Sequence, residues 1–358
     1  MTKLKEHKPS KIEALKAMTP ADRRRAIFDG IMNNAMFIII ALVIIYVAIK
    51  NPRFLSIPSL VNIISLTAAK LPIALGVGGC IILAGTDISA GRQVGLAACI
   101  SAGLQLTTNK LCPGLQILPI PVVLLCVLVA CAMVGFVNGF FMAKFKLHPF
   151  IVTLSTQLIV YGLVLLFMQL GTNGGQTLSG MSEGYRNFII KPLLTLKTSS
   201  GPVTVPRYVL YSTIITAIVW VIWNKTAFGK NMYAVGSNEE AANVSGVNVS
   251  KTIILVFVMA GMLYGITGFM DAARIASVNA TTGLNYEADA IAACVIGGIS
   301  FVGGIGKVSG AIIGVLLLQI IFAGLNFLSV DANYLYIVKG LIILIACSID
   351  MRKYLVRK

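Results

Sequence analysis

The stretch IMNNAMFIIIALVIIYVAI, residues 31 to 49, decides the class of this protein. Its nineteen residues form one largely apolar run, close to the ~20 that a helix needs to cross a bilayer. Similar runs recur along the 358-residue chain, of which 57% is hydrophobic and only 12% charged. A mean hydropathy of +0.88 excludes the soluble multidomain proteins that this length would otherwise suggest. The sequence therefore predicts an all-α, polytopic membrane protein.

The residues around this run indicate how the chain enters the membrane. Eight Lys and Arg residues precede it within residues 1–30, and no A-x-A-like cleavage site follows it. The run is also too long for the core of a signal peptide. We therefore expect a cytoplasmic basic tail over residues 1–30, followed by a helix that stays in the membrane. The net charge of +16 does not indicate nucleic-acid binding, because the basic residues lie in short runs between apolar stretches.

Further apolar runs complete a transmembrane domain over residues 31–350, with about ten spanning helices in all. Both termini, including a short tail at 351–358, are then cytoplasmic. This arrangement puts 19 of the 29 Lys and Arg residues on the cytoplasmic side, as the positive-inside rule requires. The spans are predicted at residues 31–49, 60–84, 90–108, 117–142, 149–170, 207–223, 252–270, 287–302, 308–327 and 333–349.

Three features depart from this plain pattern. Lys70 and Pro72 interrupt the run at 60–84, which predicts a broken or partly interfacial helix. Residues 171–205 form the longest external loop, and their Gly, Ser and Thr content favours a mobile linker over a docking surface for an external partner. Lys339, near a span end, is expected to snorkel to the outer interface.

No enzymatic site is indicated. The chain has two histidines, His7 and His148, and its seven cysteines lie mostly inside apolar runs without a C-x-x-C pair. The run GGIGK at 303–307 is not a phosphate loop, because Phe301 and Val308 stand where that loop needs Gly and Ser/Thr. We expect no catalytic residue, no metal site and no cofactor, and ATP hydrolysis would have to occur in another chain.

Polar residues near the span ends are candidates for a pathway or gate. Asp87 and Ser89 precede a helix and suit its N-terminal cap, and Arg92 could pair with Asp87. Glu287 and Asp289 stand in a first helical turn, where carboxylates are stabilised by the helix dipole, so a structural role is favoured for them. The scarcity of ionisable groups deep in the spans gives little support to an ion-driven mechanism. The pathway candidates are Asp87, Ser89, Arg92, Gln93, Glu287 and Asp289, with further amides at Asn62, Asn138, Gln157 and Gln319.

The longest internal loop, NKTAFGKNMYAVGSNEEAANVSGVNVSK at 224–251, carries the signals of a short helix. Ser237 and Glu240 form a capping box, and Gly246 supplies a C-terminal stop. The predicted helix, 238–245, is shorter than the ~12–15 residues that are stable alone in water. It must therefore pack on something outside the bilayer, either a second protein or its own membrane domain.

The amino-acid sequence of this loop resembles a motif of a known protein family. Glu240, Ala241, Ala242 and Gly246 reproduce the E-A-A-x-x-x-G motif of ABC importer permeases, whose coupling helix docks in a groove of the ATP-binding subunit. The motif falls in a loop of the predicted side and length.

Two more stretches narrow the resemblance. GTDISAGRQVGLAA at 85–98 and YEADAIAACVIGGISFVGGIGKVSG at 286–310 are similar to the signature stretches of bacterial sugar permeases that serve ribose, xylose and galactose. The resemblance extends over residues 36 to 352, nearly the whole chain.

The resemblance implies a subunit of the bacterial inner membrane that works with a second copy of itself. Its partners would be a tandem ATP-binding subunit on the cytoplasmic side and a periplasmic or lipid-anchored sugar-binding protein outside. The expected solute is galactose or a galactoside, with ribose, xylose or a nucleoside as alternatives and a stand-alone secondary carrier as a different class. Contact with the ATP-binding subunit is implied for Ser237, Glu239, Glu240, Ala241, Ala242 and Gly246.

Regularly spaced glycines predict close packing of helices, more within the chain than at a dimer seam. The turns GTDIS and GGISF, each followed by a Gly/Ala-rich helix, also suggest an internal repeat of the kind that borders transport pathways. The glycines in question are Gly91 and Gly95, Gly135 and Gly139, Gly261 and Gly265, and Gly306, Gly310 and Gly314.

Overall fold

The structure is a computed structural model. The residues that it describes are 19, 24, 35–108, 114, 116–170, 174–198 and 201–355. The predicted basic tail lies outside them, apart from residues 19 and 24.

Each of the ten predicted spans corresponds to a helix in the described residues. Six of these helices, α4, α6, α7, α9, α12 and α14, are long and apolar enough to cross a membrane by length and composition. The bounds are α3 (Ala35–Lys50), α4 (Ile57–Ile82), α5 (Ala90–Gln105), α6 (Ile120–Phe145), α7 (Pro149–Met168), α9 (Tyr208–Lys225), α12 (Val249–Ile275), α13 (Tyr286–Ile296), α14 (Val308–Phe327) and α15 (Ala332–Leu355), with a 3-10 turn η1 at Pro52–Leu55.

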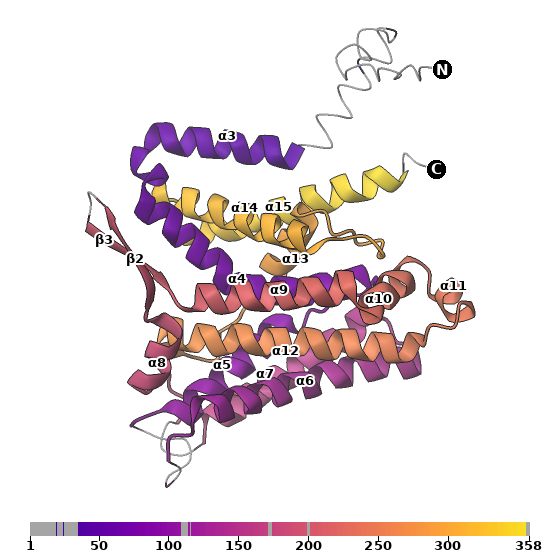
Figure 1. Cartoon of the computed structure of the whole chain (residues 1–358), viewed down its shortest axis with the longest axis horizontal. Helices are drawn as coiled ribbons and strands as arrows, with labels where there is room; N and C mark the ends of the chain where they lie inside the picture. The colour runs from indigo at the N-terminus through magenta and orange to yellow at the C-terminus, as the bar shows by residue number, and fades with distance from the viewer. Residues whose placement is uncertain are drawn as a thin grey trace, which may run out of the picture.

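The long helices lie side by side, with smaller elements at their two ends (Figure 1). At the hairpin end lie α8 (Glu183–Ile190) and the antiparallel pair β2 (Pro192–Thr198) and β3 (Gly201–Pro206). At the loop end lie α10 (Ala227–Ser237) and α11 (Glu239–Val244), and α15 ends toward the same side. The helix α12 packs against α4, α5 and α6 and forms the centre of the buried core.

The predicted span 287–302 is only half as long as expected. Its helix, α13, has eleven residues and ends at Ile296. At ~1.5 Å per residue this makes about 16 Å, against the ~30 Å of a hydrocarbon core. The backbone turns at Gly298, which has a φ of +83°, a left-handed conformation that suits glycine.

The predicted break at Lys70 and Pro72 is wrong, because α4 is continuous over 26 residues. A proline inside a helix leaves the carbonyl four residues earlier without its usual donor. That carbonyl belongs to Ala68, and the Ser212 hydroxyl on α9 donates to it at 2.6 Å. A hydroxyl from a neighbouring helix thus satisfies the freed group, as is known for prolines in membrane helices.

The linker interpretation of residues 171–205 is also wrong for the described part of that segment. Leu178 and Ser179 pair with the strand at Ser277–Val278, and Ser182 caps α8. The ring of Tyr185 is fully buried, and its hydroxyl donates to the carbonyl oxygen of Phe269 on α12. The segment is therefore anchored on the helices by hydrogen bonds and by a buried aromatic side chain.

The spaced glycines do serve packing within the chain. A Cβ atom added at Gly135 or Gly139 would collide with the backbone of α12, and one added at Gly261 would meet the carbonyl of Cys131 on α6. One added at Gly314 would collide with the carbonyl of Ala293 on α13. The prediction of internal packing at these positions is confirmed.

We predict that Gly314→Ala destabilises the protein by about 1–3 kcal/mol, the usual range for overpacking, because no side chain nearby can move aside for the new methyl group. The matched control is Gly162→Ala in α7, which also has 20 residues and where an added Cβ meets nothing within 4 Å. Thermal unfolding in detergent, followed by light scattering, measures both. Equal melting temperatures would contradict the prediction.

Candidate functional site

The loop end carries the predicted short helix, but its cap differs from the prediction. Ser237 is the last residue of α10 and forms no capping box. Asn238 adopts the extended backbone that a cap requires, and its Oδ1 accepts from the Ala241 amide at 2.8 Å. The helix α11 that follows has six residues.

The C-terminal stop of α11 is confirmed. Gly246 has a φ of +84°, and its amide donates to Asn243 at 3.0 Å. The Val247 amide donates to Ala242, also at 3.0 Å, which completes a Schellman motif. All backbone bonds that close this helix are therefore local.

The helix α11 touches its own membrane domain with one side only. Ala242 is 5% exposed and belongs to the core, and the Glu239 carboxylate forms an ion pair with Lys146 at the end of α6. On the other side, Val244 is 89% exposed. Of the residues predicted to contact a partner, Ser237, Glu239, Glu240, Ala241 and Gly246 are exposed and only Ala242 is buried.

A groove of about 940 Å³ runs beside α11, lined by polar residues that include Lys146, Glu240 and Asn243. A second cavity, of about 450 Å³, lies between α11 and the turn that joins α4 to α5. Both cavities are at the loop end, so α11 borders open space as well as the buried core.

The segment α10 joins this loop end to the interior helices. Gly236 lies so close to the carbonyl of Ile82, the last residue of α4, that a Cβ there would collide with it. The same carbonyl accepts from the Gly304 amide at 2.7 Å, and the Tyr233 hydroxyl donates to Gly306 at 3.0 Å. The loop therefore contacts both of the turns in which a short helix meets a longer one.

These two turns have the same local structure. After α4, Ala84 has a φ of +60° and the Gly85 amide donates to Cys80 at 2.9 Å. After α13, Gly298 has a φ of +83° and the Ile299 amide donates to the carbonyl of Cys294, again at 2.9 Å. The same type of hydrogen bond also ends α11, so it is a general way of closing a helix and the internal repeat stays a prediction.

Three of the predicted pathway residues form one buried polar network with Asn138. Ser89 Oγ donates to Asp87 at 2.6 Å and accepts from Gln93 at 2.9 Å and from Asn138 at 3.1 Å. All four side chains are fully buried. Ser89 stands at the N-cap position of α5, as predicted, but its hydroxyl takes part in this network and makes no capping hydrogen bond.

The other predicted pathway residues lie apart from this network. Arg92 and Asp87 form no ion pair in the described part of the chain, and the Arg92 guanidinium donates to the carbonyl of Ala280 at 3.1 Å. Glu287 and Asp289 stand in the first turn of α13, as predicted. Glu287 packs on the backbone of Gly91, whereas Asp289 forms an ion pair with Lys339 at 2.9 Å. Lys339 therefore points into the protein and does not snorkel outward.

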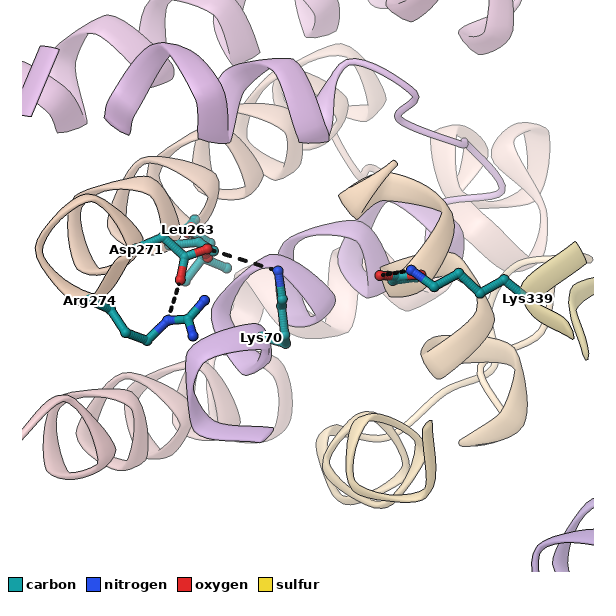
Figure 2. Close-up of polar contacts among 7 residues, drawn as sticks. Lys70, Leu263, Asp271, Arg274 and Lys339 are labelled. Carbon is teal, nitrogen blue, oxygen red and sulfur yellow. Dashed lines mark hydrogen bonds and ion pairs between the residues drawn. The ribbon is translucent and has the colours of Figure 1, made fainter. Parts of the chain in front are cut away.

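A group of charged side chains that meet between α12 and α4 was not predicted from the sequence. Figure 2 shows the Asp271 carboxylate facing Arg274, at 2.8 Å, and Lys70 of α4, at 3.9 Å. Asp271 is fully buried, and the Lys70 ammonium also lies over the ring of Tyr286. The signal was an aspartate one residue beyond the predicted span 252–270 and an arginine three residues later, the spacing of an ion pair on a helix.

Comparison with known proteins assigns the chain to a family. Residues 59–347 match the sequence model described as branched-chain amino acid transport system / permease component. The chain belongs to this family. It is therefore a permease component and not itself an enzyme, and its apolar helices make it a multi-pass protein of the bacterial inner membrane.

Several curated relatives of this permease match almost from end to end. The galactose/methyl galactoside import permease of Haemophilus influenzae is 40% identical, over 92% of this chain and 97% of its own. The protein of that name from Escherichia coli is 38% identical, over 94% and 98%. The ribose import permease of Bacillus subtilis is 34% identical, over 93% and 97%. No solved structure gives a significant match.

Proposed function

We propose that this permease is the membrane subunit of an ATP-driven, binding-protein-dependent importer of galactose or methyl galactosides. The assignment of the solute rests on the higher identity to galactose permeases, 38–42%, than to ribose permeases, 32–34%. Two copies would form the translocation pathway between a tandem ATP-binding subunit and an external sugar-binding protein. Ribose and other small sugars are the next candidates.

The proposed topology has ten membrane segments, with both termini in the cytoplasm. The loop end would be cytoplasmic and the hairpin end external. Two observations support this orientation: the excess of Lys and Arg in the loops and tails predicted to be cytoplasmic, and the directions of α3, which runs toward the hairpin end, and of α15, which ends toward the loop end (Figure 1). In this topology α5 and α13 lie within the membrane, but neither helix spans it by itself.

The helix α11 would be the docking element for the ATP-binding subunit. A valine that is 89% exposed on a six-residue helix leaves an apolar side chain in water, and a groove in a partner would bury it. Ala242 and the ion pair of Glu239 would meanwhile hold the helix to the membrane domain. Movement of the partner would then reach the ends of α4 and α13 through Gly236 and Tyr233.

Uptake into cells tests the solute. The chain is expressed with the ATP-binding and sugar-binding subunits of its own organism in a host without galactose importers. We expect accumulation of radiolabelled galactose that excess methyl galactoside abolishes and excess ribose leaves unchanged. Competition by ribose alone would reassign the solute.

A stand-alone secondary carrier is the second candidate, because Asp271 is a carboxylate within a membrane helix, as in ion-coupled carriers. Its pairing with Arg274 and Lys70 favours a structural role. Uptake that persists after ATP depletion with the ion gradient intact would establish the carrier.

A further inference from the structure

Two short helices begin halfway through the molecule. Gln93, in the first turn of α5, reaches Gly261, where an added Cβ would lie 3.2 Å from its Oε1. Gly261 is the thirteenth of the 27 residues of α12. Tyr286, the first residue of α13, lies under Lys70, which is the fourteenth of the 26 residues of α4. Both helices therefore begin near mid-depth of spanning helices.

These two helices run in opposite directions from one meeting point. Gly91 of α5 and Gly283, just before α13, are in backbone contact, and neither has room for a Cβ. The far end of α5, at Gln105, bonds Ser182 beside α8, whereas the turn after α13 contacts α10. Their N-terminal ends, where the helix dipoles are positive, thus approach each other at mid-depth. We call residues 87–93 and 283–289 the half-helix junction.

The junction is open on one side, toward α7. There Arg92, Glu287 and Tyr161 of α7 are each only partly buried. The Arg92 guanidinium lies 4.1 Å from the centre of the Tyr161 ring. Charged groups at this depth are costly in lipid and face the protein interior or a water-filled space. The open side is therefore unsuited to contact with lipid.

Three amide oxygens, on α5, α6 and α7, have no hydrogen-bond partner within the described residues. Gln157 lies one helical turn before Tyr161, and its Oε1 has no hydrogen-bond partner within the described residues. Among those residues the Gln93 Oε1 and the Asn138 Oδ1 also lack partners, although both side chains are fully buried. Buried amide oxygens are costly when unpaired, so they indicate donors that this structure lacks, such as water or hydroxyl groups. The neighbouring Leu158, in contrast, is 65% exposed and suits lipid.

We propose that Arg92 and Glu287 of the half-helix junction, together with Gln157 and Tyr161 of α7, line the aqueous pathway of the sugar at mid-depth, with a second copy of the chain closing its other side. Guanidinium, amide and carboxylate groups can exchange hydrogen bonds with the hydroxyl groups of a passing sugar. The inference deepens the proposed function and rests on it, because it assigns the solute a position in the membrane domain.

Cysteine accessibility tests this assignment. Gln157→Cys and Tyr161→Cys are made in a background with Cys112, Cys126 and Cys347 replaced by serine, and each is compared with a lipid-facing control on the same helix, Leu158→Cys and Leu163→Cys. The probe is a charged, membrane-impermeant methanethiosulfonate, applied to membranes that contain the assembled complex. Only the thiolate reacts, and it forms in water. We therefore expect the cysteines at positions 157 and 161 to react at least about tenfold faster than the two controls.

Two outcomes overturn the proposal. If all four cysteines react equally slowly, the face contacts lipid. If the cysteines at positions 157 and 161 resist the probe but form disulfides between two copies on oxidation, this surface is a subunit interface without water. Co-purification of the ATP-binding subunit is measured on the same samples, so failure of the importer assignment is seen separately. Gln157→Cys leaves the contact of Arg92 with Tyr161 in place and keeps the test valid if Tyr161→Cys fails to fold.

Discussion

Replacing Val244 by aspartate is expected to abolish both the co-purification of the ATP-binding subunit and sugar uptake. The Val244 side chain is 89% exposed, so it contributes little to packing within the chain and the fold should survive the change. In the proposed complex it fills an apolar groove, where an unpaired carboxylate would pay a desolvation cost of several kcal/mol. A cost of about 4 kcal/mol corresponds to a loss of roughly a thousandfold in affinity.

The matched control is Leu194→Asp, at an apolar position that is 54% exposed on β2 at the opposite end of the molecule. It should leave the ATP-binding subunit bound. Affinity purification from solubilised membranes, with equal loading of the permease, measures both variants. Normal retention of the ATP-binding subunit by the Val244→Asp variant would remove α11 from the docking surface.

Replacing Asp271 by asparagine is expected to lower the stability of the membrane domain more than any surface change. The substitution leaves Arg274 and Lys70 without their buried counter-ion. Breaking a buried ion pair from one side costs about 3–5 kcal/mol, because the remaining charge is uncompensated. We expect a large loss of folded permease in the membrane and a clear fall in the melting temperature in detergent.

The control for Asp271→Asn is Glu239→Gln, which removes an ion pair of another kind. The pair of Glu239 with Lys146 is exposed, with 46% and 65% of the two side chains accessible. Exposed pairs contribute only about 0–1 kcal/mol. The melting temperature of the isolated permease should therefore hardly change for this variant. A similar fall in melting temperature in both variants would show that the buried ion pairs of Asp271 contribute no more to stability than the exposed pair.

Much of the secondary structure was predictable because it depends on features that are local in sequence. Apolar runs of the right length located a helix for each predicted span, and α14 has the predicted bounds. Gly246 stops α11 through its own backbone conformation, which requires no distant contact. The cap was misassigned between neighbours: Ser237 and Asn238 both have suitable side chains, and the backbone of α10 decided which of them stands at the cap.

The contacts among the pathway candidates were predictable only in part. Asp87, Ser89 and Gln93 lie within seven residues of one another, and the turn before α5 together with its first turn brings them into contact. Their fourth partner, Asn138, comes from α6, and the pairing follows from how α5 and α6 pack. The partner of Arg92 was misassigned for the same reason, because the carbonyl of Ala280 to which it donates is 188 positions away in the chain.

The sequence by itself determined the membrane class, the helical segments, the short capped helix and the glycines that let helices approach. Each of these follows from hydrophobicity and backbone preference over a few neighbouring residues. The tertiary structure alone decided the rest. It let the Ser212 hydroxyl satisfy the carbonyl freed by Pro72, and it paired Asp271 with Lys70. These outcomes depend on the depth and rotation at which one helix meets another, and residues some 140 to 200 positions apart in the chain set both.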